Sequence, residues 1–175
     1  MPSALSPAEA AEIDAFLAEE KRLDGIPIWR ESSWPGEMDA VWNIQDSLGI
    51  TRATLRFRCP RAARAWPSIS LIFRASPIWR IDLVAPDAWK PNPPGASSLS
   101  LPAIVRGSHS HTWHDNRAHL LSQDQWSLPY RRPLPAAIRR LPQAIASLAD
   151  DVNLTLDPAQ RGFDVPPQAD LFEGR

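Results

Sequence analysis

The chain has 175 residues, 43% of them hydrophobic, and a formal net charge of −1. Its length and apolar content predict a single globular domain and exclude an intrinsically disordered chain. Its one cysteine, Cys59, excludes an internal disulfide and a cysteine-based zinc site. The first residues lack the basic start and apolar run of a signal peptide, and no stretch approaches the ~18 apolar residues that span a bilayer. We therefore expect a cytoplasmic protein with no membrane partner.

The charges are unevenly distributed along the chain. Residues 1–50 contain ten acidic and three basic residues, residues 51–145 four acidic and fourteen basic, and residues 146–175 six acidic and two basic. A basic middle between acidic ends is typical of a surface that binds a polyanion such as nucleic acid. Alternatively, the acidic ends neutralise the middle within the fold.

The N-terminal part predicts a helix over residues 7–22. Ser6 and Glu9 have the spacing of a capping box, and Pro7 occupies the first helical position. Apolar residues recur at helical spacing and should pack on the core: Ala10, Ile13, Phe16 and Leu17. Asp24-Gly25 should follow the end of this helix.

Four segments between residues 38 and 84 alternate apolar and polar residues, with the period of half-buried strands. The predicted inward side chains are Met38, Ala40, Trp42, Ile44, Ala53, Leu55, Phe57, Ile69, Leu71, Phe73, Trp79, Ile81 and Leu83. Ile78 should point outward, and Ala75-Ser76-Pro77 should form the last tight connection. We predict an antiparallel sheet of about four to five strands with one face covered by helices.

The uncovered face of this sheet should carry five arginines. They are Arg52, Arg56, Arg58, Arg74 and Arg80. Guanidinium groups suit bidentate contacts with phosphate, so these residues are candidates for nucleic-acid binding. The alternative is an ordinary solvated surface.

The remaining segments complete an α+β fold. Residues 85–105 are rich in proline and predict a loop, and the histidine-rich segment should form another. Residues 135–150 predict one C-terminal helix, or two if Pro142 splits it. The chain should thus form one domain over residues 1–155, followed by a proline-rich, acidic and mobile tail over residues 156–175.

All four histidines lie within eleven positions, which marks this segment as the place to look for chemistry. In His109-x-His111 both side chains share a strand face, so they could ligate one divalent ion, zinc or manganese. His114 is the preferred third metal ligand, with Asp115 and His119 as alternatives. Metal-free acid–base chemistry or phosphate contact, and purely structural hydrogen bonding, stay open.

Two resemblances bear on function. The segment IVRGSHSHTW is similar to the H-x-H motif of JAMM metalloproteases, although His111 is followed by ten residues before Ser122-Gln123-Asp124, where that family has seven. Over residues 69–155 the order R-x-D, N-P-x-G and G-x-H-x-H resembles small bacterial proteins of mobile elements and, more distantly, TumE-like toxins of toxin–antitoxin modules. This second resemblance implies that Arg80 and Asp82 face His109 and His111 across the sheet.

The leading interpretation is a toxin-like or accessory protein of a mobile element or defence locus that acts on nucleic acid or the replication machinery. Its binding partner could be a cognate antitoxin. If the chain is an enzyme, Asp82, His109 and His111 are the candidate catalytic residues for phosphodiester cleavage, as metal ligands or as acid and base. The alternatives are a non-enzymatic binding or inhibitor protein with structural histidines, and a JAMM-like metalloprotease.

The C-terminal peptide QADLF resembles the short peptides that bind the bacterial DNA sliding clamp. Leu171 and Phe172 would enter an apolar cleft, while Gln168 would hydrogen-bond at a second pocket, with Asp170 between them in the motif. Burying two apolar side chains contributes roughly 3–6 kcal/mol, so micromolar affinity is expected. The alternative is that the two apolar residues pin the terminus onto the core.

Overall fold

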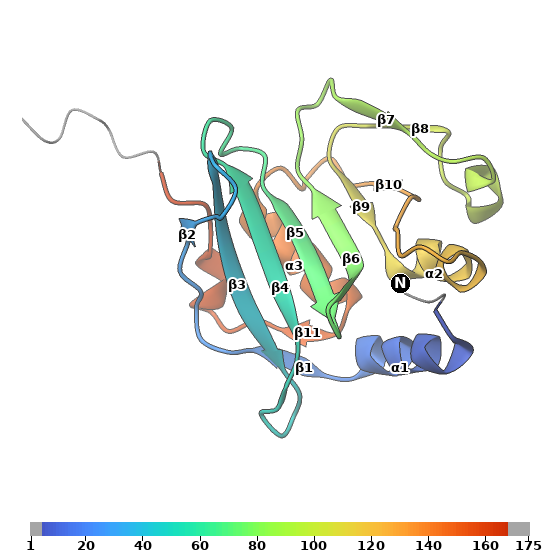
Figure 1. Cartoon of the computed structure of the whole chain (residues 1–175). Helices are drawn as coiled ribbons and strands as arrows, with labels where there is room; N and C mark the ends of the chain where they lie inside the picture. The colour runs from blue at the N-terminus through green and yellow to red at the C-terminus, as the bar shows by residue number, and fades with distance from the viewer. Residues whose placement is uncertain (1–4, 168–175) are drawn as a thin grey trace, which may run out of the picture.

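A nine-stranded sheet forms the centre of the protein in this computed structural model, which describes residues 5–167. Its strand order is β10-β9-β6-β5-β4-β3-β1-β11, with β2 also paired to β3 (Figure 1). Its strands are β1 (Lys21–Leu23), β2 (Arg30–Glu31), β3 (Glu37–Gln45), β4 (Thr51–Pro60), β5 (Ser68–Phe73), β6 (Ser76–Asp82), β9 (His109–His111), β10 (Arg132–Pro133) and β11 (Leu154–Thr155). The helices are α1 (Pro7–Ala18), α2 (Trp113–Ser122) and α3 (Leu141–Asp151). The predicted α+β class is confirmed.

The long strands β3 to β6 are those that the alternating pattern predicted. Every side chain predicted to point inward is buried, including Trp42 and Phe57 at the centre of the core. Ile78 is buried as well, contrary to the prediction, because a register shift beside Ile72 interrupts the alternation at the start of β6. The β5–β6 turn lies one residue earlier than expected, at Arg74 and Ala75, whose φ angles are 48° and 68°.

Five short strands make the sheet larger than predicted. Each of β1, β2, β9, β10 and β11 has only two or three residues, too few to show a period of two. Strand β1 pairs in parallel with β11, so the sheet is mixed and the prediction of a purely antiparallel sheet is wrong.

Helix α1 begins with the predicted capping box, in which the Glu9 amide donates to the Ser6 hydroxyl over 3.2 Å. It ends at Ala18, four residues earlier than predicted. The Lys21 ammonium donates to the Phe16 and Leu17 carbonyls at 2.6 and 3.2 Å, which satisfies carbonyls at the end of the helix. Burial lowers the pKa of Lys21 to about 8. The chain then enters the sheet as β1.

The histidine segment is not a loop, contrary to the prediction. His109 to His111 form β9, and Thr112 then caps α2 by accepting a hydrogen bond from the Asp115 amide. Residues 85–105 also contain structure, namely a hairpin of β7 (Trp89–Pro91) and β8 (Ile104–Arg106) around the short 3-10 helix η1 (Ala96–Leu99).

Helix α3 begins at Leu141, so the predicted helix over residues 135–150 starts six residues too early. Pro142 therefore lies in the first turn, where a proline breaks no helical hydrogen bond and causes no kink. None of the described helices is long and apolar enough to cross a membrane.

The chain stays packed beyond residue 155, where the mobile tail was expected to begin. Leu156 is buried, and Gln160, in the 3-10 helix η2 (Gln160–Gly162), is buried as well. Phe163 stacks on Trp29 with 5.8 Å between ring centroids and meets Trp42 and Phe57 edge-on. The predicted start of the tail is therefore wrong, because this segment contributes to the core.

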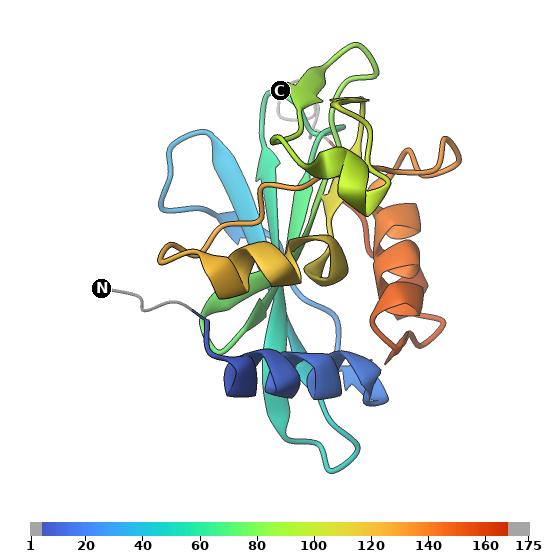
Figure 2. The same ribbon diagram turned by 90° about the vertical axis from the view of Figure 1, so that its right-hand side faces the viewer.

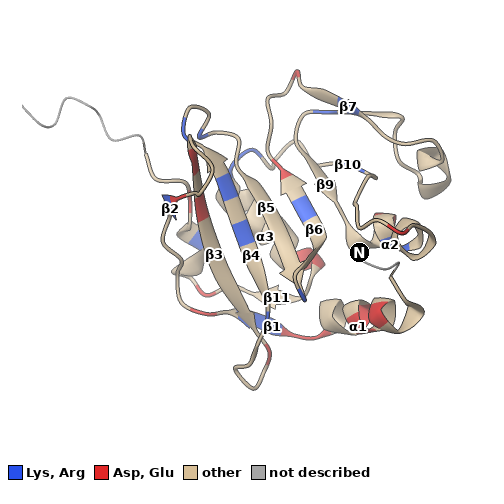
Figure 3. Cartoon of the chain, in the orientation of Figure 1, with Lys and Arg blue, Asp and Glu red and all other residues tan. Residues whose placement is uncertain are grey.

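The helices leave one face of the central strands open. Figure 2 shows α3 along one face of the sheet, with α1 and α2 crossing beside the β6 end. Among the described residues no helix covers the opposite face of β3 to β6, which faces the viewer in Figure 1. Figure 3 shows basic positions along β4 and β6 and acidic positions along β3. The candidate site lies at the β6–β9 side of the open face.

Candidate metal centre

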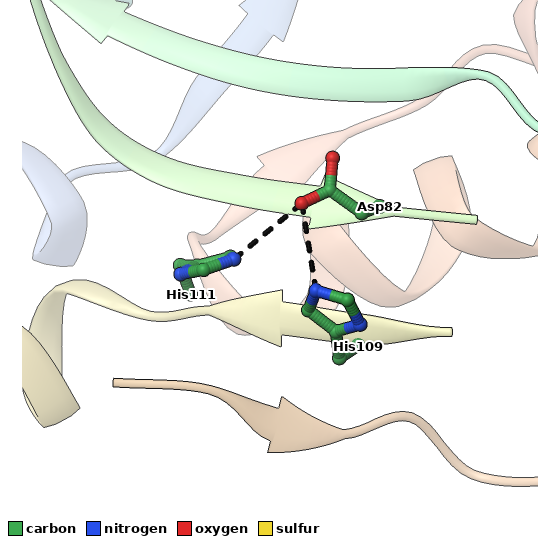
Figure 4. A group of neighbouring side chains, drawn as sticks. All are labelled: Asp82, His109 and His111. Atoms are coloured by element: carbon green, nitrogen blue, oxygen red, sulfur yellow. Dashed lines mark ion pairs between the residues drawn. The ribbon is translucent and has the colours of Figure 1, made fainter. Parts of the chain in front are cut away.

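The pairing of β6 with β9 brings a carboxylate and two imidazoles together. In this antiparallel register Asp82 lies opposite His109, and Arg80 lies opposite His111. Residues two apart share a face of a strand, so all four side chains project to the same side of the sheet. The juxtaposition that the resemblance implied is confirmed (Figure 4).

The distances within this group fit one divalent ion. Asp82 Oδ2 lies 3.6 Å from His109 Nε2 and 3.4 Å from His111 Nε2. Tetrahedral zinc with bonds of about 2.0–2.2 Å places neighbouring ligand atoms roughly 3.4 Å apart. One ligand atom from each residue lies within 4.8 Å of the others. Asp82, His109 and His111 could therefore hold a metal ion and leave a coordination position free.

Hydrogen bonds at the far side of each ring fix how the imidazoles face the carboxylate. His109 Nδ1 lies 3.0 Å from the Gly107 carbonyl oxygen, and His111 Nδ1 contacts the Leu128 carbonyl oxygen. A carbonyl oxygen only accepts, so each Nδ1 carries a hydrogen and each neutral ring presents the lone pair of Nε2. Metal-bound histidines are oriented by this same kind of hydrogen bond. When an imidazole is protonated, its Nε2 instead carries a hydrogen that it donates to Asp82 Oδ2, so a metal ion and a proton are alternative occupants of this position.

The charge states also favour a metal. Burial lowers the pKa of His109 and so favours its neutral, ligating form, although the Gly107 carbonyl and Asp82 act in the opposite direction. Burial acts to raise the pKa of Asp82, but its contacts with His111 and Arg80 prevail and hold this pKa below its usual value. A neutral imidazole and an ionised carboxylate are the forms that bind metal ions.

Arg80 binds one oxygen of the Asp82 carboxylate, and the histidines lie beside the other. Arg80 Nε and Nη2 both lie 2.8 Å from Oδ1, which leaves Oδ2 directed at the histidines. The guanidinium therefore fixes the rotation of the carboxylate. Arg80 is a positioning residue for the candidate metal centre.

A cavity of about 330 Å³ opens beside the carboxylate. The histidines are only 4% and 6% exposed, so access to the group is from the Asp82 side. The cavity is lined by Glu37, Arg58, Pro60, Trp66, Ser68, Arg80, Asp82, Leu83, Val84 and Ala85. A ligand in this cavity could reach an ion held by Asp82.

The other predicted metal ligands lie elsewhere. His114 packs edge-on against Trp79, which points to the opposite face of β6 from Asp82. Asp115 binds Arg132 and the Thr112 hydroxyl, and His119 contacts Ser127. His114 was the wrong choice of third ligand, because its place in α2 turns it away from β9. Asp124, the counterpart of the metalloprotease aspartate, follows α2 and is exposed.

The five predicted arginines divide into two groups. Arg56, Arg58 and Arg80 lie on the open face, where two cross-strand rows lead to the histidines. One row is Asp39, Arg58, Ser68, Asp82 and His109, and the other is Val41, Arg56, Ser70, Arg80 and His111. Arg52 and Arg74 lie at the ends of strands and pair with Asp46 and Glu12.

Most of the arginine charge on the open face is locally neutralised. Arg56 pairs with Asp39 at 3.6 Å, and Arg80 pairs with Asp82. Arg58 has no carboxylate partner within the described part of the chain, and it lines the cavity beside the candidate metal centre. Arg58 is therefore the guanidinium best placed to bind an anion there.

Sequence reasoning missed the residue that holds the backbone of Tyr130, two residues beyond Leu128. Asn116 is completely buried in α2, and its amide donates to the Thr112 and Tyr130 carbonyls at 2.8 and 3.1 Å. Its oxygen accepts from the Tyr130 amide at 2.9 Å. Asn92, from the N-P-x-G motif, holds Arg131 through both backbone groups in the same way. An isolated asparagine in a helix gives no sequence signal for this role.

We predict that Asn116→Ala destabilises the fold and weakens metal binding together. Buried backbone groups of Tyr130 lose their partners, at a cost of about 2–3 kcal/mol in the free energy of unfolding. Leu128 lies two residues earlier, so loss of its contact with His111 should weaken zinc binding roughly 10- to 100-fold. Urea unfolding and zinc titration measure the two effects. Asn43→Ala, at an exposed position on β3, is the control and should change neither. Unchanged zinc affinity in the Asn116 variant would show that Asn116 does not support the metal centre.

No family model, curated protein or solved structure matches the chain.

The sliding-clamp-like peptide, with Gln168, Asp170, Leu171 and Phe172, lies outside the described residues. Arg64 Nη1 donates to the Pro166 and Pro167 carbonyls at 2.7 Å, which anchors the last described residues. Clamp binding stays a prediction.

Proposed function

We propose that the chain is a divalent-metal-dependent phosphodiester hydrolase acting on nucleic acid. The observation that carries this proposal is the convergence of His109 Nε2 and His111 Nε2 on Asp82 Oδ2, with both Nδ1 atoms committed to carbonyls. Zinc and manganese both accept such nitrogen and oxygen ligands. This activity would suit the toxin-like or accessory role that the sequence resemblance implies.

The side chains around the cavity have complementary roles in this proposal. A bound zinc ion would supply Lewis-acid activation of water, whose pKa it can lower to about 7. Arg58 would bind the phosphate, because its guanidinium lines the cavity without a carboxylate partner among the described residues. Glu37 lines the same cavity from β3, three strands away from Asp82, and would contact the substrate there.

The test is hydrolysis of bis(p-nitrophenyl) phosphate and of a fluorescent oligonucleotide by protein loaded with zinc or with manganese. We expect activity that EDTA removes and added metal restores. Arg58→Ala should lower kcat roughly 10²- to 10³-fold while the metal content stays unchanged. Arg30→Ala, on β2, is a control at an exposed position that does not line the cavity. Hydrolysis that survives both EDTA and Asp82→Asn would refute the proposal.

A second candidate is a binding or inhibitor protein in which the histidines are structural. The exposures of 4% and 6% for His109 and His111 favour it, because they match ordinary buried side chains. In that case the purified protein would hold no metal, and His109→Gln/His111→Gln would lower the stability without changing partner binding.

A further inference from the structure

The cavity beside the candidate metal centre adjoins a second and larger cavity. The second has a volume of about 470 Å³ and extends toward β8 and the segment before α3, where Arg106 and Arg139 line it. Trp66 and Val84 line both cavities. The two cavities therefore adjoin at these side chains, with Asp82 lining the first, and we call the pair the Trp66 groove.

Each cavity of this groove contributes an arginine without an ion-pair partner among the described residues. Arg58 lies in the first cavity, which Glu37 and the Arg80–Asp82 pair also line, and Arg106 and Arg139 lie in the second. No carboxylate lines the second cavity, and neither Arg106 nor Arg139 has an ion-pair partner among the described residues. Arg139 donates through Nε to the Ala136 carbonyl, which holds the side chain. Its terminal nitrogens form no hydrogen bond with a described residue. Charges repeated along a groove favour an extended polyanion over a single phosphate.

An aromatic side chain lies between the two groups of arginines. Trp66 is half-buried in the wall that both cavities share. Proteins that bind single-stranded nucleic acid combine a basic groove with aromatic side chains on which unpaired bases stack. A base that is free to stack on a protein side chain is available in a single strand but not within an intact duplex. The nearly complete burial of His109 and His111 also favours a flexible strand that can bend into the site.

We infer that the Trp66 groove binds single-stranded nucleic acid, with Arg106 and Arg139 on flanking phosphates and a base on Trp66. This inference rests on the proposed function for the placement of the strand in the groove, because the phosphate to be cleaved then lies beside Arg58 and Asp82. Binding in the groove itself does not require the ion. Binding and metal loading can therefore be tested separately.

The experiment is fluorescence anisotropy of the full chain with a labelled single-stranded oligonucleotide, as DNA and as RNA, in EDTA at several salt concentrations. Arg106→Ala/Arg139→Ala should weaken binding about tenfold and reduce the log–log salt slope by roughly 1.4, since each phosphate contact in a single strand contributes about 0.7. Arg161→Ala, which removes one positive charge from a cavity beside α3 and outside the groove, should leave the slope within about 0.3 of wild type.

Trp66 gives an independent readout. Trp66→Ala should weaken binding about tenfold, whereas Trp66→Phe, which keeps an aromatic plane, should retain most of the affinity. The inference is overturned if the double arginine variant binds like wild type, or if a duplex of the same sequence binds as tightly as the single strand. EDTA is present in this assay, so oligonucleotide binding is measured without a metal ion and stays intact even if the metal centre does not exist. If the groove does not bind nucleic acid, metal binding and hydrolysis of bis(p-nitrophenyl) phosphate stay intact.

Discussion

The wild-type protein is expected to bind one zinc or manganese ion per chain, and Asp82→Asn/His111→Gln is expected to bind none. Removing two of the three ligands leaves His109 alone, so affinity should fall by far more than 100-fold. A free ion at a hundred times its Kd stabilises the native state by about 2.7 kcal/mol, which raises Tm by roughly 5–11 °C for a domain of this size. Metal analysis after dialysis and thermal unfolding with and without the ion measure these effects.

His114→Ala and His119→Ala are the matched controls, because both residues lie outside the group that could hold the ion. Each should retain one ion per chain and the full rise in Tm. The double variant should keep its far-ultraviolet circular dichroism, since Asn and Gln preserve the size of the side chains. Stoichiometric metal in a folded double variant would show that the ion binds elsewhere.

The central sheet could be predicted because its strands are long enough to show a pattern. Strand β3 has nine residues and β4 has ten, so the alternation of buried and solvated side chains repeats several times. Strand β9 has three residues, and the buried residues of α2 include Asp115 and Asn116. These polar positions replace the apolar stripe by which a helix is recognised, and the segment therefore looked like a loop.

The candidate site could be predicted only in part. His109 and His111 follow from their spacing, because alternate residues of a strand share a face. Asp82 is 27 positions before His109, and the family resemblance placed it beside the histidines; no local pattern does so, because only the pairing of β6 with β9 brings it to them. The choice of His114 assumed that sequence neighbours stay neighbours in space. The end of β9 and the start of α2 fall between these residues and turn His114 to another side.

The arginines show a second limit of sequence reasoning. No acidic residue occurs between Asp46 and Asp82, so the segment reads as a strongly basic face. Across the sheet, however, Asp39 reaches Arg56, and Glu12 of α1 reaches Arg74 at the turn. Cross-strand and helix–turn pairs depend on register and packing, which the local pattern does not encode. The positive charge available to a ligand is therefore confined to fewer residues, among them Arg58 in the cavity beside the candidate metal centre.

Phe163→Ala is expected to lower the free energy of unfolding by about 3–5 kcal/mol, the range for losing a large aromatic side chain from a core. Phe163 is 7% exposed and its ring meets three other aromatic rings, of which Trp29 stacks on it in parallel. Urea unfolding followed by tryptophan fluorescence measures the loss, because Trp29 and Trp42 report directly on this cluster.

The size of that loss decides whether the last described segment belongs to the cooperative unit. Leu48→Ala, at a side chain that is 82% exposed, is the control and should change stability by less than about 0.5 kcal/mol. A similarly small effect for Phe163→Ala would mean that residues 157–165 detach before the sheet unfolds, as a mobile tail would. A loss near 4 kcal/mol with an unchanged m-value would instead mean that the sheet and this segment unfold together. Arg64 and Arg140 bind this segment at Pro166 and Asp164, which ties it to the domain as far as the last described residues.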